Sequence, residues 1–189
     1  VSKGFFMSAS YSYGVAKTLM DGTSDQAASN WGYVNNPGSP NNVPLAVSNF
    51  DPGHRISATF AYDIRLWKDA KATWSVFYSG QSGRPYSLVV YRDINGDGYA
   101  NDLAYLPASA SEMAFTNGTY QQLVDWLNVE PCLAGFLGKI MPRNACRGPW
   151  INTLDARLNV QLPSIKKVRV ELTLDILNVL NLINTENGI

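Results

Sequence analysis

The chain has 189 residues, of which 46% are hydrophobic, 12% aromatic and 16% charged, and its net charge is zero. Because a balanced charge leaves no basic surface for phosphate groups, we expect no nucleic-acid partner. No stretch reaches the about 18 uninterrupted apolar residues of a transmembrane helix, so any insertion into a membrane would have to use strands.

Apolar and small polar residues alternate along residues 4–17, the first predicted strand, where Phe5, Met7 and Tyr11 oppose Ser8 and Ser10. The second predicted strand, residues 54–66, alternates more strictly. Ile56, Phe60 and Ile64 lie on one face, and Arg55, Asp63 and Arg65 lie on the other. A strand of about 9–11 residues with this pattern is long enough to cross a bilayer, with lipid on one face and water on the other.

Three further segments follow the same two-residue period. They are residues 71–81, 150–161 and 167–178. In the last of them Asp175, Asn178 and Asn181 recur at every third residue, so residues 172–183 also allow a helix at their end. We predict a strand to about Asn178.

One face of these five strands carries charges of both signs, whereas the other face is almost uncharged. The charged positions are Arg55, Asp63, Arg65, Asp155, Arg157, Arg169, Glu171 and Asp175. A soluble β-sandwich also alternates, but a lattice of opposite charges suits a wet lumen, and each lipid-facing Arg or Lys would cost roughly 2–4 kcal/mol. The predicted fold is all-β, an antiparallel transmembrane β-barrel segment of about five strands.

Short and long connections alternate between the predicted strands. Residues 67–70 and 162–166 are short turns, whereas residues 18–53 and 82–149 are long loops. Outer-membrane barrels place short turns in the periplasm and long loops outside the cell, so we expect the two long loops to be extracellular. Five strands do not close a barrel, which needs at least about 8, and we therefore expect residues 1–189 to be part of a larger barrel.

Several motifs, taken in order, resemble a known family. They are Ser48-Asn49-Phe50-Asp51-Pro52-Gly53-His54-Arg55, Gly80-Gln81-Ser82-Gly83-Arg84-Pro85-Tyr86-Ser87, Asp93-Ile94-Asn95-Gly96-Asp97-Gly98-Tyr99-Ala100-Asn101-Asp102-Leu103, Arg147-Gly148-Pro149-Trp150, Asn152-Thr153-Leu154-Asp155-Ala156-Arg157-Leu158 and Leu174-Asp175-Ile176-Leu177-Asn178-Val179-Leu180-Asn181. Together they resemble the C-terminal part of the barrel of TonB-dependent outer-membrane receptors, in particular the Oar-like branch.

This resemblance implies a 22-stranded barrel in the bacterial outer membrane, surrounded by lipid, with an N-terminal plug that lies outside this sequence. It also implies energy-coupled uptake of a large or scarce extracellular ligand, driven by TonB with ExbB and ExbD. The alternative is a non-transporting outer-membrane barrel that acts as an adhesin or a structural assembly component. A third interpretation is a secreted, calcium-stabilised carbohydrate-binding sandwich, which would be soluble without detergent.

The loop at residues 93–102 carries the pattern of a metal site. Asp93, Asn95 and Asp97 supply oxygen atoms at alternate positions, Gly96 occupies the sixth place, and Tyr99 the seventh, where an EF-type calcium loop uses a carbonyl group. Asp102 adds a further carboxylate, but Ala104 replaces the bidentate Glu. We predict Ca²⁺ here, against the alternative of an Asn-Gly and Asp-Gly turn cluster that needs no ion.

Cys132 and Cys146 are the only cysteines, and both lie in the second long loop. An even pair in an exported protein predicts a disulfide, worth roughly 3 kcal/mol in the loop-entropy model. Just before it, residues 119–127 have helical spacing, with Leu123, Trp126 and Leu127 on one side. We predict a short packed helix there.

We expect no enzymatic activity. His54 is the only histidine and stands at the start of a strand, where a hydrogen bond at the barrel rim suits it better than general-base catalysis. In the first long loop, aromatic and amide side chains that would suit sugars or peptides gather close together. They are Trp31, Tyr33, Asn35, Asn36, Asn41 and Asn42. Such residues also occur in surface loops that bind nothing.

Overall fold

The computed structural model describes residues 4–67, 69–164 and 168–183. The chain divides into two compact units. The sheet unit comprises the described residues within 1–14, 52–83 and 149–189, and the loop unit comprises residues 15–51 and 84–148. Within the described ranges, no helix is long and apolar enough to span a membrane.

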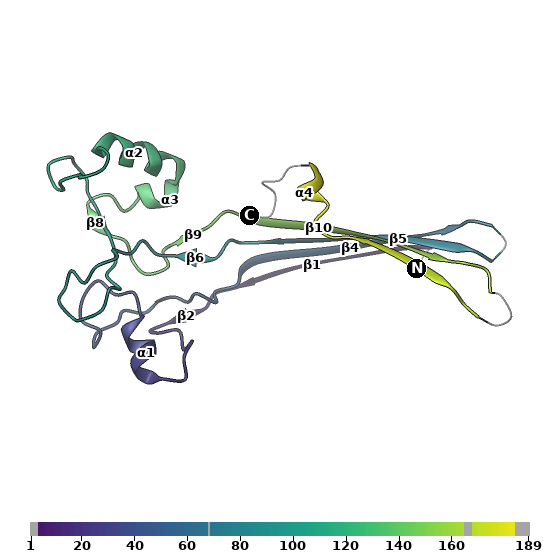
Figure 1. Ribbon diagram of the computed structural model, residues 1–189, viewed down its shortest axis with the longest axis horizontal. Coiled ribbons are helices and arrows are strands. Elements are labelled where there is room, and N and C mark those ends of the chain that lie inside the picture. The colour runs from purple at the N-terminus through teal and green to yellow at the C-terminus, as the bar shows by residue number, and fades with distance from the viewer. Residues whose placement is uncertain (1–3, 68, 165–167, 184–189) are drawn as a thin grey trace. The chain divides into compact units, whose positions relative to one another are not determined.

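The sheet unit is built on one five-stranded antiparallel sheet (Figure 1). Its strands are β1 (Phe5–Gly14), β4 (Gly53–Arg65), β5 (Lys71–Gln81), β10 (Ile151–Gln161) and β11 (Glu171–Ile176). They lie in the order β1-β4-β5-β10-β11, so strands that follow one another along this unit are also neighbours in the sheet. Five strands joined in this order form an antiparallel meander, as the sequence predicts.

The register keeps the two predicted faces apart across the sheet. Phe60 of β4 pairs with Met7 of β1 and with Val76 of β5, whereas its neighbour Thr59 pairs with Ser8 and with Phe77. Because successive side chains of a strand point to opposite faces, most apolar residues share one face and the charged and small polar residues share the other, with Phe6 and Phe77 as apolar exceptions on the polar face. The two-residue period is confirmed.

The predicted ends of the first and last strands are wrong. The first strand ends at Gly14 rather than at residue 17, because the Ala16 N–H donates to the Asp51 carboxylate. The last strand ends at Ile176, because Asn178 adopts the left-handed conformation with φ +51°. A short helix, α4 (Leu180–Ile183), follows it. The helical end that the three-residue spacing allowed is therefore present, and residue 167 of the predicted strand lies outside the described residues.

The loop unit consists of the two long connections, which carry folded structure of their own. Three two-residue strand pairs are present, namely β2 (Lys17–Thr18) with β3 (Ala46–Val47), β6 (Pro85–Tyr86) with β9 (Cys146–Arg147), and β7 (Tyr105–Leu106) with β8 (Lys139–Ile140). The helices are α1 (Ala27–Gly32), α2 (Tyr120–Val129) and α3 (Pro131–Ala134). None of the strand pairs, and neither α1 nor α3, follows from the periodicity of the sequence.

A hydrophobic core holds the second segment of the loop unit together. Its buried members are Leu106, Leu127, Leu133, Met141 and Cys146. The predicted disulfide between Cys132 and Cys146 is present and joins α3 to β9. The predicted helix is also confirmed as α2, which begins with a capping box between Thr119 and Gln122. Leu123 packs against this core, but Trp126 is 45% exposed and does not share the buried side of α2.

Buried polar side chains tie the two segments of the loop unit to each other. The Asn144 amide donates to the Val47 carbonyl at 2.8 Å and to the Asn49 side chain at 2.9 Å. The Asn101 amide donates to the carbonyls of Gly32 and Val34 at 3.1 and 2.9 Å. Since both asparagines are buried, their loss would leave backbone carbonyls without partners. The two loops therefore form one body.

Candidate functional site

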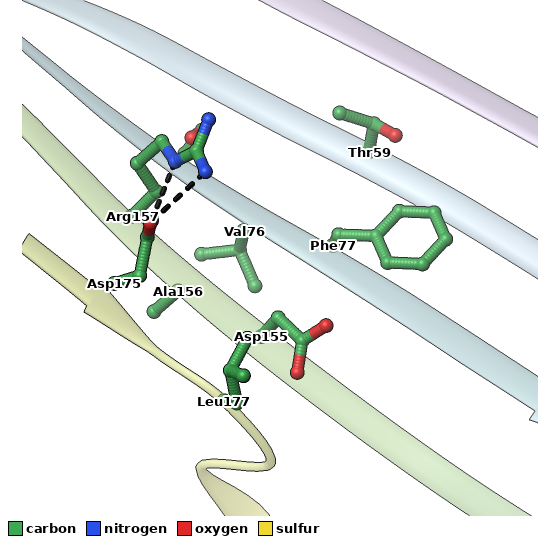
Figure 2. Close-up of a pocket in the computed structure, with 9 residues that line it drawn as sticks. Thr59, Val76, Phe77, Asp155, Ala156, Arg157, Asp175 and Leu177 are labelled. Atoms are coloured by element: carbon green, nitrogen blue, oxygen red, sulfur yellow. Dashed lines mark hydrogen bonds and ion pairs between the residues drawn. The ribbon is translucent and has the colours of Figure 1, made fainter.

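The polar face of the sheet carries a hollow of about 340 Å³ (Figure 2). Figure 2 shows Arg157 of β10 and Asp175 of β11 reaching toward each other across neighbouring strands. Arg157 Nε and Nη2 donate to the two carboxylate oxygens of Asp175 at 2.5 and 3.0 Å. Such a two-pronged pair fixes both side chains more firmly than a single contact does. The hollow is lined by Thr59, Ser75, Val76, Phe77, Asp155, Ala156, Arg157, Asp175 and Leu177.

A second ion pair on this face joins Lys71 and Asp63, with 2.8 Å between Nζ and Oδ2. The same carboxylate accepts a hydrogen bond from Thr73 Oγ1 at 2.7 Å. Strand pairing sets Asp63 opposite Thr73 and Arg65 opposite Lys71, and Lys71 reaches diagonally to Asp63. Charges of opposite sign thus meet across strands on the polar face, as expected for a face in contact with water.

The opposite face of the sheet is a continuous apolar surface. The rings of Phe5 and Phe60 pack edge to face with centroids 5.2 Å apart, and those of Phe60 and Trp74 with centroids 5.7 Å apart. Trp74 remains 43% exposed, and Leu158 is also exposed. No second layer seals this face within the described residues, so its side chains are available to a surrounding apolar medium.

His54 lies at the start of β4 and on the apolar face. Its Nδ1 atom hydrogen-bonds the Tyr11 hydroxyl at 2.7 Å, and its ring packs against Tyr13 with centroids 4.5 Å apart. The predicted hydrogen bond at the start of this strand is confirmed. Aromatic side chains with polar tips at the end of a transmembrane strand are typical of the girdle that meets lipid headgroups.

In the predicted metal loop, the carboxylates are turned toward the backbone. Asp93 accepts hydrogen bonds from the N–H groups of Gly96, Asp97 and Gly98 at 2.7 to 3.1 Å. Asp102, which is buried, accepts from the N–H of Ile94 at 2.7 Å. Gly96 and Gly98 have φ values of +77° and +90°, which this tight turn requires.

Four of the five candidate ligands lie in this turn, whereas the Asp102 side chain is buried. The Asn95 amide donates to Asp97 at 3.2 Å and to the Gly38 carbonyl at 3.0 Å, and the Tyr99 N–H donates to Asp97. Over the described ranges, no group of three or more His, Cys, Asp or Glu side chains is placed to hold a metal ion. A cation would have to replace hydrogen bonds that these oxygens already make, and calcium binding stays a prediction.

The first segment of the loop unit forms a second hollow, also of about 340 Å³. Its aliphatic and proline lining consists of Leu19, Met20, Val34, Pro40 and Val43. Three of the predicted sugar- or peptide-binding residues, Trp31, Asn41 and Asn42, complete the lining. The chain thus brings an indole ring and two amides to one apolar hollow.

A smaller polar hollow, of about 60 Å³, shares Val34 as a lining residue with the apolar hollow. Tyr33 and Asn35 line it, together with Asp21 and Arg143. Burial lowers the pKa of the Arg143 guanidinium, and the nearby Asp21 carboxylate opposes that shift. Arg143 donates to the Thr18 carbonyl at 2.5 Å, and Asp21 accepts from Ser48 Oγ at 2.6 Å. The sequence does not predict that Asp21 and Arg143 line one hollow, because the two residues are far apart in the chain.

Asn36 differs from the other residues predicted to bind a ligand, because it is buried. Its amide donates to the Ser39 carbonyl at 2.6 Å, and its backbone N–H donates to the Asn101 carbonyl at 3.2 Å. Asn36 therefore holds the turn at residues 36–39 in place, and its side chain does not face the hollows.

A model of the outer membrane beta barrel domain family matches residues 1–188. The search of curated proteins and the search of solved structures return no match. An outer-membrane barrel needs strands with one face toward water and one toward lipid, and the described sheet has a charged face and an apolar face. The chain belongs to the outer-membrane β-barrel domain family and lies in the bacterial outer membrane.

Proposed function

We propose that this chain is part of a TonB-dependent receptor of the Oar-like branch, which imports a large or scarce ligand across the outer membrane. In this proposal the described strands form part of the wall of a 22-stranded barrel, near its C-terminal end. TonB, with ExbB and ExbD, acts through parts of the receptor outside this sequence. The chain itself has no catalytic role.

The observation that carries the proposal is the pairing of charges on one face of a sheet whose other face is apolar and exposed. Arg157 pairs with Asp175, and Lys71 with Asp63, on the polar face. Exposed ion pairs contribute little to stability, so four charged side chains on this face are better explained by contact with water than by a need for strength. A water-filled lumen is what a transporter of polar solutes requires.

The loop unit supports a receptor function rather than a purely structural wall. A barrel wall needs only short connections, yet here two long connections share a folded unit with a disulfide, buried amides and two hollows. Binding residues are commonly held on loops that a rigid scaffold positions. The loop unit therefore provides a surface on which an extracellular ligand would be captured before its import.

The test uses the full-length receptor in its native host. Cells would be given fluorescent oligopeptides and oligosaccharides, and uptake would be compared between the parent strain, a strain without the receptor and a strain without TonB. We expect uptake that requires both proteins, together with binding of the purified receptor to the periplasmic domain of TonB. Surface binding without TonB dependence would favour the adhesin alternative instead.

We also propose that Ca²⁺ stiffens the loop at residues 93–102. Asp93, Asn95, Asp97, Tyr99 and Asp102 are the proposed ligands. The side chains of Asp93, Asn95, Asp97 and Asp102 already accept hydrogen bonds from backbone N–H groups, and these bonds shape the turn. Calorimetric titration of the full-length receptor with Ca²⁺, with and without chelator, tests this proposal. No heat, and no change in hydrogen exchange across the loop, would leave the ion-free turn as the explanation.

A further inference from the structure

The apolar hollow of the loop unit has the size and lining of a site for one uncharged side chain. Its volume of about 340 Å³ lies at the lower end of the range for small-molecule sites, about 300–1,000 Å³. None of its described lining residues is charged. Trp31 is 41% exposed, so part of its indole ring is open to a ligand. An aliphatic or aromatic group would fill the hollow without burying a charge.

Two amide side chains stand at this hollow with unused hydrogen-bonding capacity. The side chains of Asn41 and Asn42 make no hydrogen bond within the part of the chain that the structure describes, and both residues are exposed. Their backbone N–H groups donate to Ser39, whose carbonyl also accepts from the buried Asn36 amide. These hydrogen bonds fix the turn. The amides of Asn41 and Asn42 stay available at the hollow, and each can both donate and accept a hydrogen bond.

The size of the neighbouring polar hollow limits which polar groups of a ligand could fit beside the apolar hollow. At about 60 Å³ it has room for a carbonyl group or for water, but not for a sugar ring. Val34 lines both hollows, so both border the same residue. A chain of sugars would need space for a second polar ring beside the first, whereas a peptide needs space only for its backbone.

We propose that the loop unit binds an oligopeptide, with one hydrophobic side chain in the hollow beside Trp31 and Val43 and with peptide groups paired to Asn41 and Asn42. An amide matches a peptide group, because each offers an N–H donor and a carbonyl acceptor. The proposal rests on the proposed receptor function only for the fate of the peptide, since binding does not depend on import. It names the ligand class that this site takes.

The test measures binding of acetyl-Gly-Leu-Gly-amide, acetyl-Gly-Phe-Gly-amide, acetyl-Gly-Gly-Gly-amide and maltotriose to the full-length receptor in detergent, by calorimetry. We expect the Leu and Phe peptides to bind and the other two probes to bind at least about tenfold more weakly, a difference of about 1.4 kcal/mol. Val43→Arg places a charge in the hollow and is expected to weaken peptide binding at least about tenfold.

Two further variants separate the roles of the residues. The double change Asn41→Ala and Asn42→Ala is expected to weaken binding about fivefold or more, since two hydrogen bonds are lost. Tyr91→Ala is the matched control, because Tyr91 is 94% exposed in the same unit and lines neither hollow. An intact Cys132–Cys146 disulfide and parent-like hydrogen exchange in α2 would show that each variant is folded.

Tighter binding of maltotriose, equal binding of the Gly peptide, or no binding of any probe would overturn the peptide assignment. Val43→Arg with unchanged peptide affinity would overturn the placement of the side chain in this hollow. Neither result touches the receptor proposal, whose test is TonB dependence. Conversely, peptide binding without TonB binding would keep this inference and remove the import.

Discussion

The sheet unit and the loop unit are stabilised in opposite ways. In the sheet unit the only buried hydrophobic residues among those described are Ala70 and Ala72, and large apolar side chains such as Trp74 stand exposed. In the loop unit Leu106, Leu127, Leu133 and Met141 are buried around a disulfide. The sheet depends on its backbone ladder and on the lipid around it, whereas the loop unit carries its own core. The apolar side chains of the loop unit are thus buried inside the protein, whereas those of the sheet unit are covered by lipid.

The sharpest way to separate the two units is to damage the core of one of them. Leu133→Ala removes a fully buried side chain from the loop unit and is expected to destabilise that unit by roughly 2–5 kcal/mol. Hydrogen exchange in the full-length protein would show faster exchange in α2 and α3, with the amides of β4 and β5 unchanged. Val129→Ala, at an exposed position of α2, is the control. Equal loss of protection in both units would show that the sheet depends on this core.

The sheet is tested by moving one charge from face to face. Ala58→Arg places a cation on the apolar face, and Ser57→Arg places it on the polar face of the same strand. We expect Ala58→Arg to lower the free energy of unfolding in lipid vesicles by roughly 2–4 kcal/mol. Ser57→Arg is expected to have a much smaller effect. Equal effects of the two changes would contradict the assignment of the faces.

A smaller effect is expected at the start of α2, where Thr119 caps the helix. Its Oγ1 accepts a hydrogen bond from the Gln122 N–H at 3.3 Å, and the Gln122 side chain accepts from the Thr119 N–H at 2.9 Å. Thr119→Ala is expected to destabilise the loop unit by about 1 kcal/mol, and Thr119→Ser by much less. The measurement is local hydrogen exchange in α2. A change of similar size in Thr119→Ser would show that the hydroxyl group is not what matters.

The smallest expected effect is a dependence on pH confined to the loop unit. The Tyr105 hydroxyl donates to Glu112 at 2.8 Å, and the Ala108 N–H also donates to it at 2.9 Å, so both lower the pKa of this carboxyl from its ordinary value of 4.5. A carboxyl whose pKa is lower in the folded state stabilises that state above its unfolded-state pKa. This contribution is lost as the pH falls through the folded-state pKa.

Hydrogen exchange near residues 105–112 would therefore quicken as the pH falls from about 6 to about 3, after correction for the intrinsic pH dependence of exchange. Glu112→Gln is expected to flatten this response, because it removes the titrating group. The Tyr105 phenol is affected in the opposite direction, since the same hydrogen bond raises its pKa. A parent-like response in Glu112→Gln would show that another group titrates.

The sheet could be predicted from the sequence because its information is local. In β4 apolar and polar residues alternate, so the sequence alone predicts that Phe60 and Thr59 lie on opposite faces. This prediction needs no information about the neighbouring strands. The helix α2 and the disulfide were equally readable, from helical spacing and from a single cysteine pair. The end of β11 could not be predicted in this way, because a pattern of apolar residues does not show that the backbone of Asn178 is left-handed.

The loop unit could not be predicted in the same way because its contacts join distant segments. Asn144 bonds the carbonyl of Val47, and Arg143 bonds that of Thr18. No periodic signal links these residues, and a buried asparagine looks in sequence like any loop asparagine. Asn36 is an example. The sequence suggests that its amide could contact a ligand, but in the structure the amide donates to the Ser39 carbonyl and holds a turn.

The interlocking of residues 15–51 with residues 84–148 constrains any attempt to re-engineer this barrel protein. Transplanting either connection alone into a related barrel would carry across half of a folded body and leave Asn101 and Asn144 without the carbonyls that they bond. The two connections are therefore one structural unit, and both would have to be exchanged together to move that unit from one barrel to another.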